Sequence, residues 1–190
     1  MRNSYIRLFC TLTVIIGLSP LLNAQSSRAI PLDMNLIIDG SASFQVSRND
    51  AISWLNNQIV DPILIDGDNI TVWRAGDSAE IIYSAEISGG KEDLKNALQS
   101  LLTDAAAPDF SGALTAAATR VSRVSRDRLS YTMLITASAM GLERALAGNA
   151  RNLLRWSRTE RAERWKVLVI GTDIGPRVRD AAAAYMSLSQ

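Results

Sequence analysis

The sequence contains no histidine, and its single cysteine, Cys10, lies near the amino terminus. Histidine is the side chain most often used as a general base, and the cysteine thiolate is a frequent nucleophile. A G-x-S-x-G nucleophile elbow is also missing. These absences argue against the common hydrolytic mechanisms, so we expect no catalytic residue and a protein that is not an enzyme.

Long apolar runs are also scarce, and the only prominent one lies near the start, in "MRNSYIRLFCTLTVIIGLSPLLNAQ". Arg2 and Arg7 flank its beginning, the apolar stretch covers Leu8 to Leu18, and the small residue Ala24 follows. This layout is typical of a secretory signal peptide. The stretch is too short to span a bilayer comfortably, although an uncleaved amino-terminal anchor is an alternative.

The predicted domain organisation follows from cleavage after Ala24: a signal peptide at 1–24 and one domain at 25–190. The mature chain would then be periplasmic or extracellular, with no transmembrane segment. It would also lack cysteine, which excludes disulfides and thiol chemistry from its function.

An excess of either charge is absent as well. The whole chain has 20 basic and 19 acidic residues, and loss of the signal peptide lowers the basic count to 18. Nucleic-acid binding relies on a surplus of Lys and Arg, so this balance argues against a nucleic-acid partner.

What the sequence does contain is an alternation of apolar strand patterns and amphipathic helix patterns. Strands are predicted near 32–38, 69–76, 79–87, 131–139 and 165–175, and helices near 47–59, 91–102, 111–124, within 141–160, and at 176–188. Helical crossovers between buried strands favour an α/β fold: a doubly wound, mostly parallel sheet with one antiparallel edge strand and helices on both faces.

Three local signals refine this reading. Ser47 and Asp50 have the spacing of a capping box that would start the first helix, and Asp61-Pro62 would end it. Gly76-Asp77-Ser78 separates two strand patterns and predicts a hairpin, which would make the second strand antiparallel.

The most informative stretch is "LIIDGSASF", in which an apolar strand ends at Asp39 and the hydroxyls of Ser41 and Ser43 follow. In doubly wound sheets the functional crevice lies at the carboxyl ends of the strands. Carboxylate and hydroxyl oxygens suit Mg²⁺, whose octahedral site would keep open positions for water or a partner's carboxylate. Asp39-Gly40-Ser41 is also a good turn sequence, so a polar turn without a ligand is the competing interpretation.

A strand ending in D-x-S-x-S, an edge hairpin, "DFSGAL" before an alanine-rich helix and two later apolar strands together resemble a von Willebrand factor type A domain. The resemblance covers about Leu32 to Leu188. It implies that Asp39, Ser41 and Ser43 belong to a metal-ion-dependent adhesion site, which binds Mg²⁺ or Mn²⁺ and often an acidic residue of a protein partner.

The same resemblance exposes gaps in that site. Pro108 stands where the family has a threonine, and Ala137 stands where it has an aspartate. Loss of one carboxylate near a dication weakens binding strongly, since unit charges at about 4 Å attract by roughly 4 kcal/mol at an effective dielectric near 20. Asp109, Ser111 and Ser138 are the residues that would partly substitute, and any Mg²⁺ or Mn²⁺ binding is expected to be weak.

Three functions remain open from the sequence. The first is a secreted or periplasmic, non-enzymatic module for adhesion or assembly that binds a protein partner through Asp39, Ser41, Ser43 and Ser138. The second is a metal-dependent hydrolase that uses Asp39, and the third is a purely structural envelope component.

Overall fold

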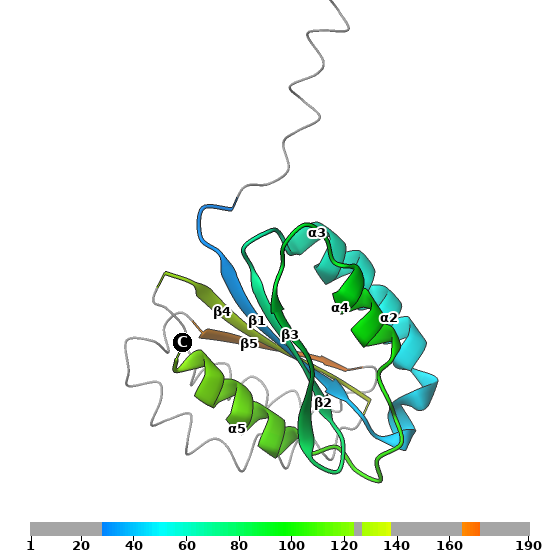
Figure 1. Ribbon diagram of the computed structural model, residues 1–190. Helices are drawn as coiled ribbons and strands as arrows, with labels where there is room; N and C mark the ends of the chain where they lie inside the picture. Colours follow the sequence, from blue (N-terminus) through cyan, green and yellow to red (C-terminus); the bar gives the residue numbers. More distant parts are fainter. Residues whose placement is uncertain (1–27, 124–126, 138–164, 172–190) are drawn as a thin grey trace, which may run out of the picture.

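The structure, a computed structural model, describes residues 28–123, 127–137 and 165–171, and of 165–171 the backbone alone. The described strands form one five-stranded sheet in the order β3-β2-β1-β4-β5 (Figure 1). All neighbouring strands are parallel except β2 and β3, which form the predicted antiparallel hairpin at the edge. Their bounds are Leu32–Asp39 for β1, Asn69–Ala75 for β2, Ala79–Glu86 for β3, Leu129–Thr136 for β4 and Trp165–Gly171 for β5.

Helices cover both faces of this sheet (Figure 1). One face carries α2 (Arg48–Leu55), η3 (Asn56–Val60), α3 (Asp61–Ile63) and α4 (Glu92–Gln99), and the other carries α5 (Phe110–Val121). The predicted fold class is therefore confirmed. The signal peptide at 1–24 and the helices expected within 141–160 and 176–188 lie outside the described residues.

The apolar core lies between the sheet and the α2–α4 layer. Every second residue of β1 points into it, namely Leu32, Met34, Leu36 and Ile38. Leu94 and Leu98 of α4 are fully buried against this cluster, as the spacing of apolar residues in that helix predicts. Within the described ranges no helix is long and apolar enough to cross a membrane.

The α5 side of β1 is different, because three of its buried residues are polar: Asp33, Asn35 and Asp39. All eight residues of β1 are buried, as is usual for a parallel strand with helices on both faces of its sheet. Buried polar groups are costly unless they find partners. Asp39 and Asp33, at the two ends of this polar row, are therefore candidates for functional residues.

The first helix begins at Arg48 with Ser47 at its N-cap position, as predicted, but its predicted end and its capping box are wrong. Ser47 makes no side-chain cap, because the 3₁₀ helix η2 (Ala42–Val46) runs into α2 and Ser47 already has a helical backbone. At the other end the chain stays helical to Ile63. The turn of η3 widens to a π-helix just before Pro62, which lacks the N–H that a regular α-turn would use.

Candidate functional site

Asp39 is the last residue of β1, at the carboxyl edge of the sheet. Its side chain is fully buried, and both carboxylate oxygens accept hydrogen bonds. Oδ1 accepts from the Ser41 backbone N–H at 2.9 Å and from the Ser41 hydroxyl at 2.6 Å. Oδ2 accepts from the Thr136 hydroxyl at 2.7 Å. The carboxylate is thus held in one orientation by its own chain.

The two serines of the motif contact each other. The Ser41 and Ser43 hydroxyls are hydrogen-bonded at 2.9 Å. Ser41 is buried, whereas Ser43 is exposed. The network therefore runs from a buried carboxylate outward to an exposed hydroxyl.

Thr136 is the member of this network that the sequence reading missed. Thr136 is the last residue of β4, the strand beside β1. In the sequence it lies within a mostly apolar strand pattern, which does not mark it as a site residue. The available signal was its position: a hydroxyl at the last residue of a neighbouring parallel strand lies at the same sheet edge as Asp39. Asp39 and Thr136 together place the site between β1 and β4, where the crossovers change face.

The loop that carries Pro108 lies against the motif. Ala105 forms an isolated parallel bridge with Ser41, in which its N–H donates to Gly40 O and its O accepts from Ala42 N–H. Arg74 fastens the same loop, since its Nε donates to Leu102 O at 2.8 Å and its guanidinium pairs with Asp104. The loop therefore lies beside the motif, and Pro108 brings no side-chain oxygen to it.

Asp109, considered as a substitute ligand, has another role. It is the N-cap of α5, and its Oδ1 accepts from Gly112 N–H at 2.8 Å. Ser111 is an exposed residue of the first turn of the same helix. Ala137 packs against the apolar cluster, and Ser138 lies outside the described residues.

The donor set does not fit a complete magnesium or manganese site. Octahedral Mg²⁺ is usually held by one or two available carboxylates. Here both oxygens of Asp39 are already engaged, and Asp109 caps a helix. In the part of the chain that the structure describes, no three acidic, cysteine or histidine residues are grouped as metal ligands.

Comparison with known proteins adds the following. No protein-family model matches the sequence, and no curated protein sequence matches it. The fold is similar to that of a von Willebrand factor type A protein from Catenulispora acidiphila, with a TM-score of 0.59 and 16% identity over 83% of this chain and 37% of that chain. It is also similar to proximal thread matrix protein 1 from the mussel byssus, with a TM-score of 0.56 and 14% identity over 80% and 41%.

The VWA domain of SpRpn10 matches along most of both chains, with a TM-score of 0.54 and 12% identity over 82% of each. The chain has the von Willebrand factor type A fold. It spans only 37% and 41% of the first two proteins, so their complete activities do not transfer. One structure of the mussel protein is described as having a zinc-occupied MIDAS motif.

Proposed function

We propose that this type A domain is an exported, non-enzymatic module for adhesion or assembly, and that it binds a protein partner at the carboxyl edge of its sheet. The observation that carries the proposal is the network of Asp39, Ser41, Ser43 and Thr136 at the switch between β1 and β4. Ligands bind at this point in doubly wound folds. Export through residues 1–24, to the periplasm or the extracellular space, is part of the same proposal.

Apolar side chains beside the network support a protein partner. Val46 is 91% exposed and Leu102 is 61% exposed. Their segments are joined by a Thr103–Gln45 hydrogen bond and by Arg48 Nε donating to Leu101 O. Exposed apolar residues next to buried polar groups are typical of protein-binding surfaces.

A metal ion has a minor place in this proposal. Asp39, Ser41 and Ser43 are the residues that would face Mg²⁺ or Mn²⁺. An acidic side chain of the partner would have to supply the carboxylate that Ala137 does not, and Pro108 supplies no hydroxyl. We therefore expect weak metal binding that depends on the partner.

The hydrolase alternative is less well supported by the geometry. A carboxylate nucleophile needs an accessible oxygen. Asp39 is fully buried and its two oxygens accept three hydrogen bonds. A purely structural envelope component would not require an exposed apolar surface beside the network. An experiment that tests partner binding at this surface therefore separates the structural role from the adhesion or assembly role.

Site-specific photo-crosslinking in the native envelope tests the proposal. A crosslinker at Val46 or Leu102 should capture one defined protein, and a crosslinker at Ile81, which is 49% exposed on the β3 edge, should not. Asp39→Asn and Asp39→Ala should reduce capture at Val46, provided that both variants remain folded by circular dichroism. Equal capture at all three positions, or no capture at any, would contradict the proposal.

Calorimetric titration of Mg²⁺ and Mn²⁺ tests the metal separately. Without a partner, the wild-type protein should give little heat of metal binding. The Asp39→Ala variant should give nearly the same heat. Tight binding that Asp39→Ala abolishes would restore a functional metal site and overturn the expectation of weak binding.

A further inference from the structure

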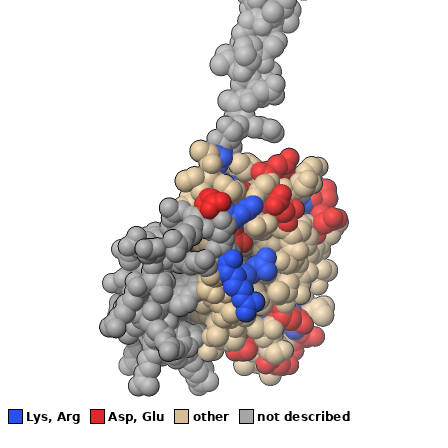
Figure 2. Space-filling model, turned by 60° about the vertical axis from the view of Figure 1, so that its left-hand side comes forward, with Lys and Arg blue, Asp and Glu red and all other residues tan. Residues whose placement is uncertain are grey.

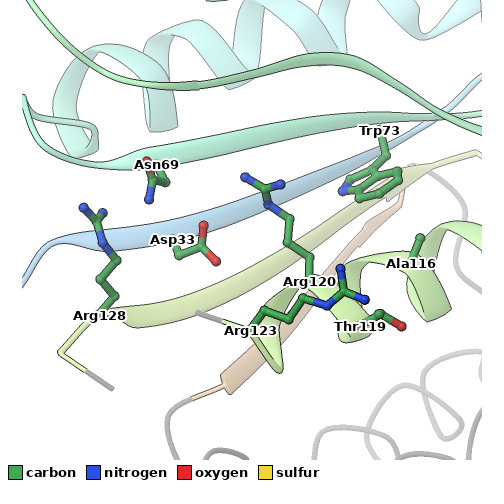
Figure 3. Close-up of a pocket in the computed structure, with 8 residues that line it drawn as sticks. All are labelled: Asp33, Asn69, Trp73, Ala116, Thr119, Arg120, Arg123 and Arg128. Carbon is green, nitrogen blue, oxygen red and sulfur yellow. The ribbon is translucent and has the colours of Figure 1, made fainter. Parts of the chain in front are cut away.

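A polar pocket lies at the other end of the strands, near the first residues of β1 and β2. It has a volume of about 660 Å³ and is lined by residues that include Asp33, Asn69, Trp73, Arg120, Arg123 and Arg128 (Figure 3). Asp33 and Asp39 are the first and last polar residues of one face of β1, about 20 Å apart at roughly 3.3 Å per residue. The pocket is thus distinct from the surface discussed above, and its volume is in the usual range for small-molecule sites.

The floor of the pocket is a buried carboxylate with an unused oxygen. Asp33 is 1% exposed, and its Oδ2 has no hydrogen-bond partner. Burial raises the pKa of Asp33 above its ordinary value, and the positive charges of Arg120 and Arg128 oppose that rise. An unpartnered buried polar atom is uncommon in proteins and calls for a specific reason, such as a ligand or a bound water.

The walls are basic, and two of the three arginines are not used by the fold. Arg128 is anchored, because its Nη1 donates to Leu32 O at 3.0 Å and to Gly67 O at 2.8 Å. Arg120 and Arg123, one turn apart on the α5 side, form no ion pair with any described residue, and Arg120 Nε is buried without a partner. Figure 3 shows Arg120 and Arg128 on either side of the Asp33 carboxylate.

The surrounding surface is consistent with an anionic ligand. Figure 2, which brings the α5 side of the molecule forward, shows basic side chains gathered near the middle of that face and acidic ones toward its ends. Guanidinium groups recognise carboxylate and phosphate oxygens through paired hydrogen bonds. The unpartnered Asp33 Oδ2 lies among these arginines, so the ligand that fits the pocket brings a hydrogen-bond donor to that oxygen as well as an anion.

We propose that this pocket binds a small organic anion whose carboxylate or phosphate contacts Arg120 and Arg123 and whose hydroxyl or ammonium group donates to Asp33 Oδ2. Trp73 and Ala116 provide the apolar part of the lining. Arg128 is held in place by two backbone carbonyls and by an ion pair with Glu86 at 3.7 Å, so the two arginines of the α5 side are the main anion-binding groups. The proposal does not rest on the protein-binding surface at the other edge.

Calorimetric titration of the purified protein with four probes tests this inference. Glycerol 3-phosphate and glucuronate carry both an anion and hydroxyls, whereas methyl phosphate and acetate carry the anion alone. At least one hydroxylated probe should bind about tenfold or more tightly than its plain counterpart. Failure of all four to bind at about 10 mM, or equal binding of both members of each pair, would overturn the proposal.

Variants identify the residues responsible. Arg123→Ala alters an exposed side chain and should weaken binding of the hydroxylated probe by about tenfold. Arg120→Ala combined with it should abolish detectable binding. Asp33→Asn should remove the preference for the hydroxylated probe while leaving a residual response to the anion.

Two control substitutions should have no effect. Arg48→Ala removes the same charge on the α2 side of the sheet, and Asp39→Ala disrupts the other site. Unchanged affinity in Arg123→Ala, or equal losses in Arg123→Ala and Arg48→Ala, would show that the pocket is not the binding site.

Discussion

At the scale of single residues, the protein places acidic side chains in buried positions and gives each one different partners. Asp39 is fully satisfied by three donors, whereas Asp33 keeps an unpartnered oxygen. Asp68 is buried too, and it accepts from the backbone N–H groups of Leu32 and Ile65. The sequence alone does not distinguish these cases, because the difference depends on which donors the fold brings to each carboxylate.

Removal of the Thr136 hydroxyl should reveal its structural role. Thr136→Val keeps the shape of the side chain but leaves Asp39 Oδ2 buried without that donor, so the free energy of unfolding should fall by about 1–3 kcal/mol. Thr136→Ser keeps a hydroxyl and should lose less. Denaturant unfolding measures both values, and a smaller loss in Thr136→Val than in Thr136→Ser would show that the methyl group, not the hydrogen bond, matters.

Asp33 should make the stability of the protein depend on pH in a direction opposite to that of a salt-bridged carboxylate. Its pKa is raised in the folded state above the ordinary value of 3.8, so the folded state holds the proton more strongly than the unfolded chain. The contribution is fully favourable below pH 3.8 and is lost as the pH rises through the folded pKa.

Asp33→Asn does not titrate and serves as the test. The free energy of unfolding of Asp33→Asn relative to the wild type should increase as the pH rises from about 3 to 7. Chemical unfolding at several pH values measures this difference. A difference that shrinks with rising pH would mean that the arginines, and not burial, dominate the environment of Asp33.

At the scale of elements, the strands within the described residues were predictable and the end of the first helix was not. The hairpin at Gly76-Asp77-Ser78 and the buried strand before Asp39 follow from local patterns, which are confirmed. The end of the first helix depends on how a π-turn accommodates Pro62, and that arrangement is set by packing. Thr136 was missed for a related reason: its contact with Asp39 depends on the register between two strands distant in sequence.

Asp109 gives an element-scale prediction that separates helix capping from metal binding. Asp109→Ala removes the oxygen that accepts from Gly112 N–H and should lower the free energy of unfolding by about 0.5–2 kcal/mol. Asp109→Asn retains a capping oxygen and should lose little. Neither variant should alter the response to Mg²⁺ or Mn²⁺ in calorimetry, and a change in that response would identify Asp109 as a ligand.

At the scale of the whole molecule, the two faces of the sheet differ in kind. The α2–α4 face holds the continuous apolar cluster, and the α5 face holds the buried polar row with a proposed site at each end. The apolar character of β1 made its burial predictable. The chemistry of the polar face could not be predicted, because it arises only when β1, β2, β4 and α5 come together.

This division predicts where stability and binding are separable. Leu55→Ala empties a fully buried position in the apolar cluster and should lower the free energy of unfolding by about 2–5 kcal/mol. Val46→Ala, at a position that is 91% exposed, should change it by less than about 0.5 kcal/mol. Denaturant unfolding gives both values, and a large loss in Val46→Ala would show that this side chain serves the fold and not a partner.

The bridge between Ser41 and Ala105 has a consequence for the selectivity of the proposed protein-binding surface. Two backbone hydrogen bonds and the Arg74 contacts join the loop after α4 to the motif at the end of β1. A surface whose two halves are already joined loses little conformational freedom when it is occupied. The proposed binding surface would therefore select partners by shape. A partner that requires the two loops to separate would bind more weakly, because the hydrogen bonds between them would have to break.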